Sequence, residues 1–117
     1  MNELIQQHCS PIGANTQQLN EQDVNQLKEK PPGWQTYEKG AELRLEKVFE
    51  FEDFRKAVAF TNQVANVANE EDHHPALLTE WGKVTVTWWT HKIKGLHQND
   101  FIMAAKTEQI YGGRYGS

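Results

Sequence analysis

Apolar and small residues recur with helical spacing between residues 54 and 69, and no glycine or proline interrupts them. The recurring positions are Phe54, Ala57, Val58, Thr61, Ala65 and Ala68, and Phe60, Val64 and Val67 widen the stripe. This is the period of an amphipathic helix with one buried face. Asp53 stands just before the segment, where a carboxylate can accept a hydrogen bond from a free backbone N–H, so it is the predicted N-cap.

Stretches of alternating residues on each side of that helix predict two β-hairpins. The predicted strands cover residues 34–38, 43–51, 77–81 and 83–92. Gly40 and Gly82 mark the two turns. The alternation in the second strand is imperfect, which indicates a β-bulge near Lys47.

The fourth predicted strand, KVTVTWWTHK, divides its residues between two faces of the sheet, because successive side chains of a strand point to opposite sides. One face carries Val84, Val86, Trp88 and Thr90, and the other carries Thr85, Thr87, Trp89 and His91. His91 is therefore expected beside Trp89, and Trp88 is expected in the core.

Two further helices complete the prediction, one capped by Asn20 and one over residues 99–110. The order α-β-β-α-β-β-α predicts an α+β fold, in which helices pack on one face of a four-stranded antiparallel sheet. Residues 20–111 are expected to form one domain. Residues 1–19 are expected to be a loosely ordered arm, and residues 112–117 a flexible tail.

Charge and composition argue against several classes of function. The 117 residues carry a net charge of −4 and no basic run, so direct nucleic-acid binding is not expected. No apolar run is long enough for a bilayer, and the first residues lack the features of a signal peptide. Cys9 is the single cysteine and cannot form an internal disulfide. We therefore expect a cytoplasmic domain without membrane attachment.

Histidines and carboxylates supply the candidate chemistry. Asp72, His73 and His74 are consecutive, and His91 and Asp100 follow downstream. Histidine has an unperturbed pKa nearest to neutrality, so these imidazoles could exchange protons in the cell. Taken alone, the two histidines could instead belong to a polar surface loop. The two aspartates could be helix caps, or a carboxylate that fixes a histidine tautomer.

A metal site is the less favoured interpretation of these residues. His8 and Cys9 could join the other histidines only from the N-terminal arm, and zinc sites usually show tighter paired spacing. No metal is therefore predicted. His97 lies close to His91 and is expected in a solvated loop.

A longer pattern around these histidines resembles the pterin-4a-carbinolamine dehydratase family. The matching residues are Gly33-Trp34, the helix entry Phe49-Glu50-Phe51-Glu52-Asp53-Phe54 with Ala57 and Phe60, then Asp72-His73-His74-Pro75, Trp81, Thr90-His91, Gly95-Leu96 and Asp100. The resemblance covers roughly residues 20–111 and is greatest to bacterial members that accompany phenylalanine hydroxylase. Two positions depart from the family pattern: Asn69 stands where Glu is common, and Leu77 where animal members have Trp.

The resemblance implies dehydration of 4a-hydroxytetrahydropterin to quinonoid dihydropterin, in tetrahydropterin recycling after an aromatic amino-acid hydroxylase has turned over. It implies a catalytic set in which His73 and His91 act as acid and base on the two sides of the pterin, while His74 binds or orients the ring. No cofactor is implied. The residues assigned to substrate binding are Asp72, Trp89, Thr90 and Asp100.

Two other functions remain open at this point. Animal members of the family also serve as dimerisation cofactors of a transcription factor, so a regulatory protein is one alternative. A pterin-binding module of molybdenum-cofactor metabolism is the other. A homodimer or homotetramer is expected in each case, because the face with Thr85, Thr87 and Trp89 carries little charge for a solvated surface.

Overall fold

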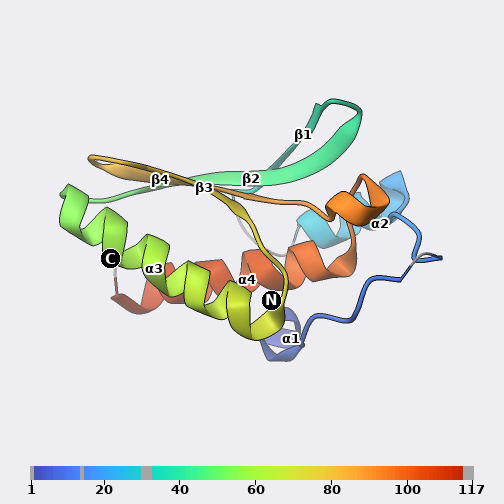
Figure 1. Cartoon of the computed structure of the whole chain (residues 1–117), viewed down its shortest axis with the longest axis horizontal. Helices are drawn as coiled ribbons and strands as arrows, with labels where there is room; N and C mark the ends of the chain where they lie inside the picture. The colour runs from blue at the N-terminus through green and yellow to red at the C-terminus, as the bar shows by residue number, and fades with distance from the viewer. Residues whose placement is uncertain (1, 14, 30–32, 115–117) are drawn as a thin grey trace.

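The computed structural model describes residues 2–13, 15–29 and 33–114, and it shows a sheet with helices packed on one side (Figure 1). The strands are β1 (Gln35–Lys39), β2 (Glu42–Glu50), β3 (Ala76–Glu80) and β4 (Lys83–Trp88). The helices are α1 (Asn2–Gln6), α2 (Glu21–Lys28), α3 (Phe54–Glu71) and α4 (Gln98–Arg114), with a 3-10 helix η1 (His91–Ile93). The strand order is β1-β2-β4-β3 and every pairing is antiparallel. The predicted α+β architecture is confirmed.

The core lies between the sheet and the two long helices, α3 and α4. β4 contributes Val84, Val86 and Trp88, all fully buried, so the predicted facing of these residues is confirmed. From α3, the buried residues are Ala57, Phe60, Val64 and Ala68. The buried face is rotated slightly about the helix axis from the predicted face, and Phe54 is therefore 53% exposed. Asp53 caps α3 as predicted, by accepting a hydrogen bond from the Lys56 backbone N–H.

The predicted bulge near Lys47 is wrong. The β2–β4 register runs without a break from Leu45 opposite Trp88 to Glu50 opposite Lys83. Lys47 faces the helices, where its Nζ lies 2.7 Å from a carboxylate oxygen of Glu108 on α4. The irregular alternation therefore comes from an inward-facing ion pair.

The predicted extension of the fourth strand to residue 92 is also wrong. β4 ends at Trp88, after which Thr90 and Gly95 pair as an isolated bridge. The chain between them forms η1 and turns back at Lys94, which has a φ of 55°. Strand alternation therefore does not extend to His91.

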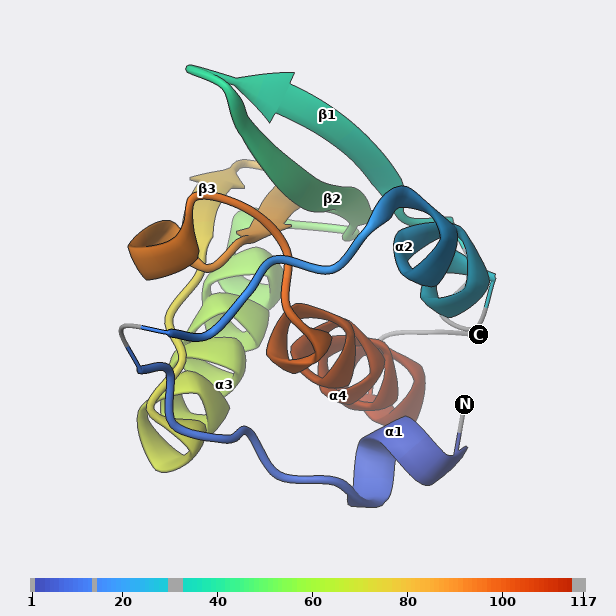
Figure 2. The same cartoon turned by 90° about the vertical axis from the view of Figure 1, so that its right-hand side faces the viewer.

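The N-terminal arm contains α1, which the sequence pattern did not predict. Leu4 is 1% exposed, and the Ile5 carbonyl accepts a hydrogen bond from Lys106 of α4. After α1 the arm passes the C-terminal end of α3 and crosses the loop that leads into α4, where the Leu19 N–H donates to the Leu96 carbonyl, before it reaches α2 (Figure 2). At the other end of the chain α4 continues through residues 112–114, and residues 115–117 of the predicted tail lie outside the described part. Within the described ranges, no helix combines the length and apolar character needed to cross a membrane.

Candidate active site

The end of α3 sends its two consecutive histidines in different directions. Asp72 is the C-cap residue and adopts the left-handed conformation, with φ 53° and ψ 42°. Aspartate tolerates this conformation better than most L-residues do. The chain reverses there, and the His73 backbone N–H reaches the Ala68 carbonyl at 3.1 Å. His73 is consequently 8% exposed, whereas His74 is exposed.

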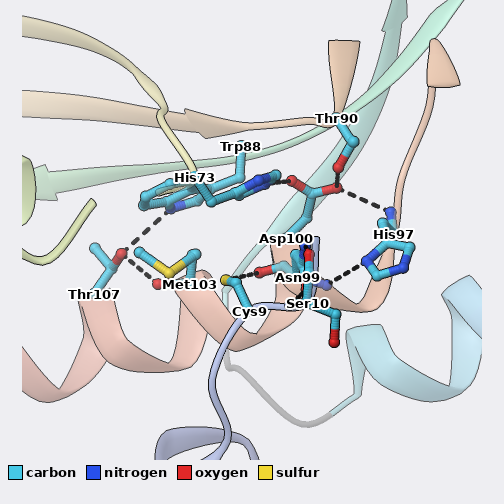
Figure 3. Close-up of polar contacts among 10 residues, drawn as sticks. All are labelled: Cys9, Ser10, His73, Trp88, Thr90, His97, Asn99, Asp100, Met103 and Thr107. Carbon is cyan, nitrogen blue, oxygen red and sulfur yellow. Dashed lines mark hydrogen bonds and ion pairs between the residues drawn. The ribbon is translucent and has the colours of Figure 1, made fainter. Parts of the chain in front are cut away.

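His73 is held at its ring edge by Asp100. Its Nε2 lies 2.6 Å from Asp100 Oδ1 (Figure 3). Asp100 Oδ2 accepts two further hydrogen bonds, from Thr90 Oγ1 at 2.8 Å and from the His97 backbone N–H at 2.9 Å. A carboxylate oxygen accepts, so Nε2 of His73 donates and Nδ1 carries the free lone pair of the neutral ring. The carboxylate therefore fixes the tautomer of His73.

His73 is also held across its ring face. The imidazole stacks on the indole of Trp88, with centroids 5.9 Å apart and an interplanar angle of 9°. The indole is fixed in turn, because Trp88 Nε1 donates to Thr107 Oγ1 at 3.3 Å. Figure 3 shows both supports of the imidazole, the carboxylate at its edge and the indole on its face.

The first turn of α4 is built by reciprocal capping. The His97 N–H donates to the Asp100 side chain, and the Asn99 N–H donates to His97 Nδ1 at 3.0 Å. A side chain at the third helical position that reaches back to the N-cap backbone is a capping box. His97 is partly buried in this role, so its predicted place in a solvated loop is wrong. Capping positions the Asp100 carboxylate against His73.

A cavity of about 400 Å³ lies beside His73. It is lined by residues 9–12 of the arm together with Glu71, Asp72, His73 and Asn99. Ligand pockets usually measure about 300–1,000 Å³, so a small bicyclic ligand fits this volume. Nδ1 of His73 has no hydrogen-bond partner among the described residues, and it is not one of their fully enclosed polar atoms. It is therefore available to a ligand in the cavity.

The other two predicted histidines have separate partners. Nε2 of His74 lies 3.0 Å from Oδ1 of Asn69, the residue that replaces the common family glutamate. The His91 side chain is 81% exposed, and its Nδ1 lies 3.1 Å from Oε2 of Glu42. Neither histidine is among the described residues that line the cavity.

Trp89 lies near His91, on the side of the sheet away from the helices. The Arg44 guanidinium lies 3.9 Å above the Trp89 ring, and Glu42 lies 3.5 Å from the same guanidinium. Trp89 Nε1 and Arg44 Nε are buried and find no hydrogen-bond partner within the described chain. The predicted site residues thus fall into three settings: one around His73 with Asp72, Thr90 and Asp100, one around His74, and one around His91 with Trp89.

The sequence pattern did not point to three residues that make contacts around these sites, namely Asn99, Glu71 and Glu42. Glu71 accepts the Cys9 N–H across 62 positions, and Asn99 accepts the Ser10 N–H across 89 positions. No local spacing marks such pairs. The described residues also contain no group of three or more His, Cys, Asp or Glu side chains that could hold a metal ion.

Residues 17–110 match the family Pterin 4 alpha carbinolamine dehydratase. The chain belongs to this family. A protein of Microcystis aeruginosa that bears the name of a pterin-4-alpha-carbinolamine dehydratase is 51% identical over 95% of this chain and 96% of its own length. One of the same name from Marinobacter nauticus is also 51% identical, over 95% of this chain and its whole length.

A solved structure shows the same fold. It is a transcriptional coactivator/pterin dehydratase from Brucella melitensis, with a TM-score of 0.73 and 34% identity, and the match covers 80% of this chain and 97% of that one. The resemblance inferred from the histidine pattern is therefore confirmed at the level of the family.

Proposed function

We propose that this protein dehydrates 4a-hydroxytetrahydropterin to quinonoid dihydropterin, with His73 as its main acid/base group. The observation that carries the proposal is the 2.6 Å contact between His73 and Asp100, at the edge of a cavity that can hold a bicyclic ligand. Membership of the family and two relatives that bear the dehydratase name support the same activity.

The reaction needs two proton movements. The hydroxyl group leaves C4a with its bonding electrons and must be protonated to depart as water, while N5 loses its proton. A positioned imidazole contributes about 10²–10⁴-fold to such transfers. His73 serves one of them through Nδ1, because Asp100 occupies Nε2 and stabilises the imidazolium whenever Nδ1 holds a proton.

Following the family pattern, His91 is assigned to the other proton transfer and His74 to holding the pterin. Neither lines the cavity beside His73, so this assignment requires the pterin to extend from the cavity towards both rings. The exposure of both rings allows them to exchange protons with water. Asp72 stays a substrate-binding residue in this proposal, since it lines the cavity with His73. Trp89 stays one as well, because it lies in the same setting as His91.

Thr90 and Asp100 fit a positioning role better than substrate binding. The Thr90 hydroxyl donates to Asp100, and both carboxylate oxygens of Asp100 already accept hydrogen bonds from the protein. Asp100 is fully buried. We assign these two residues to the orientation of His73.

The direct test is stopped-flow decay of enzymatically generated 4a-carbinolamine, with and without the purified protein. We expect faster decay with the protein, unchanged by EDTA, and a loss of about 10²–10⁴-fold in His73→Ala. If chelation abolished the activity and zinc restored it, the metal-free mechanism would be wrong. If His73→Ala kept full activity while folded, the assignment of His73 would be wrong.

We also propose that the protein is at least a homodimer and acts in the cytoplasm beside an aromatic amino-acid hydroxylase. Val48 and Leu78 flank Thr85 on the sheet face away from the helices, and they are 48% and 59% exposed. Partly exposed apolar residues in one row across three strands suit contact with a second copy. A regulatory role, such as the transcriptional coactivation for which the Brucella melitensis protein is named, would use such a surface and not the histidines.

A further inference from the structure

One wall of the His73 cavity comes from outside the region that matches the family. The match begins at residue 17, whereas residues 9–12 of the arm line the cavity. The shared domain therefore supplies His73, Asp72, Glu71 and Asn99, and the arm closes the space in front of them. The two relatives at 51% identity align over 95% of the chain, so the arm is shared with them although it lies outside the family match.

The wall is fixed at its N-terminal side by two side chains of the domain, the carboxylate of Glu71 and the amide of Asn99. The Cys9 N–H donates to Glu71 Oε1 at 2.7 Å. The Asn99 side chain pairs with both backbone groups of Ser10, accepting its N–H at 2.9 Å and donating to its carbonyl at 2.8 Å. The Cys9 thiol also points at the Asn99 carbonyl, with Sγ 3.9 Å from the oxygen.

The same wall is fixed at its C-terminal side by the segment around η1. Lys92 Nζ donates to the Ile12 carbonyl at 3.1 Å, and Gln18 Nε2 donates to the Ile93 carbonyl at 2.8 Å. Gly95 allows this approach, because a Cβ there would lie 2.6 Å from Gln18 Cδ. The wall is therefore a strap attached at both ends.

The strap and His73 are positioned by neighbouring residues of one helical turn. Asn99 holds Ser10, and Asp100 holds His73. Asn99 is 2% exposed and Asp100 is fully buried, and capping by His97 sets the backbone of both. The distance between the strap and the imidazole is thus set within a single rigid element.

We propose that residues 9–12 form a wall of the pterin-binding pocket, and that Asn99 is the positioning residue that holds this wall opposite His73. The inference rests on the proposed function, because it takes the cavity beside His73 as the place where the pterin binds. The strap excludes water from one side of the ligand and limits its position. Its loss should weaken binding of the pterin more than the proton transfer, since its hydrogen bonds go to Glu71, Asn99 and Lys92 and leave the pair of His73 and Asp100 intact.

Cys9 reports the position of the strap directly, because it is the only cysteine in the chain. Burial, reinforced by the Glu71 and Asp100 carboxylates, raises the pKa of the Cys9 thiol to about 12. Alkylation by iodoacetamide at pH 8.5 should therefore be slow while the strap is in place. If labelling requires the strap to open and a pterin binds only the closed form, 7,8-dihydropterin at ten times its Kd should slow labelling about tenfold.

The test combines this labelling with turnover in the full chain. Asn99→Ala should label several-fold faster than the wild type, and its KM for the carbinolamine should rise about tenfold while kcat changes little. Ile12→Trp enlarges a wall side chain and keeps the backbone carbonyl that Lys92 binds, and it should raise KM and weaken the protection by dihydropterin. Gln109→Ala on the exposed part of α4 is the matched control and should behave as the wild type.

The outcomes separate the two proposals. Protection of Cys9 by dihydropterin, lost in Ile12→Trp, supports the strap as a pocket wall. Normal turnover with a labelling rate that saturating dihydropterin leaves unchanged would overturn the inference and leave the dehydratase activity intact. Absence of both turnover and protection would overturn both. Because Asn99 is buried, a folded Ile12→Trp variant keeps the test decisive if Asn99→Ala does not fold.

Discussion

The imidazole of His73 and the indole of Trp88 lie almost parallel, inclined by 9° with their centroids 5.9 Å apart. Trp88 is fully buried, so it joins the core of the sheet to the candidate acid/base group. Stability and activity are therefore expected to respond together when this indole is changed.

Trp88→Phe should destabilise the fold by about 1–3 kcal/mol, since it removes buried volume and the hydrogen bond to Thr107. It should also lower kcat, because His73 loses part of the surface on which it stacks. Urea unfolding and steady-state kinetics would measure the two effects. Trp81→Phe is the control: Trp81 is 78% exposed, and its replacement should change stability by no more than about 0.5 kcal/mol.

Asp100→Asn distinguishes a positioning role from substrate binding. Asp100 now accepts hydrogen bonds from three donors, and an amide nitrogen in place of one carboxylate oxygen would face at least one of them. His73 would therefore lose its fixed tautomer. We expect kcat to fall at least about tenfold with KM within about twofold of the wild type. A large rise in KM with unchanged kcat would instead make Asp100 a substrate-binding residue.

His91 and His74 should separate in their kinetics. His91→Ala should lower kcat more than it raises KM, as expected for a group needed mainly in the transition state, while His74→Ala should act mainly on KM. Because Glu42 is the partner of His91, Glu42→Gln should reduce kcat in the same direction as His91→Ala but by less. Unchanged turnover in all three folded variants would favour the regulatory function.

Cys9 makes stability sensitive to alkaline pH. A cysteine thiol in water has an ordinary pKa of 9.0, and burial in the folded chain raises the pKa of the Cys9 thiol to about 12. Above pH 9 the unfolded chain therefore releases a proton that the folded chain retains, so the free energy of unfolding falls as pH rises from 9 towards 12. Urea unfolding from neutral to alkaline pH should show this loss in the wild type and a smaller loss in Cys9→Ala. Parallel curves for the two proteins would contradict the prediction.

Light scattering at micromolar concentration should give a mass of at least two chains. The uncovered apolar row suggests where the copies meet, so Leu78→Lys should shift the mass towards 13.5 kDa, the mass of one chain. Gln109→Lys, at an exposed position, is the matched charge control and should leave the mass unchanged. A wild-type mass near 13.5 kDa would rule out the oligomer.

The sequence predicts most of the fold because its strongest signals are local. The stripe in α3 and the alternation of Val84, Val86 and Trp88 each arise within one element, and the structure confirms both elements. Lys47 misled the strand prediction because its partner, Glu108, lies on a distant helix. The end of β4 was missed for a similar reason, since the bridge between Thr90 and Gly95 forms by turning the chain back on itself.

The candidate site is predictable only in part. The sequence brings out His73 and Asp100 through the family pattern, but it does not show that they contact each other. It gives no sign that Asn99 holds Ser10, because that contact depends on how an apparently featureless arm crosses the folded domain. Composition and spacing describe residue types along the chain, whereas these contacts depend on its path.

The strap also has a consequence for the order of folding. Its anchors join Cys9 to Glu71 and Ser10 to Asn99, across 62 and 89 positions, while each hairpin closes over a few residues. Closing a long loop costs entropy before its contacts compensate, so such contacts form late. A refolding chain should therefore recover the fluorescence of its buried tryptophans before it recovers turnover, because the core forms before the strap is in place.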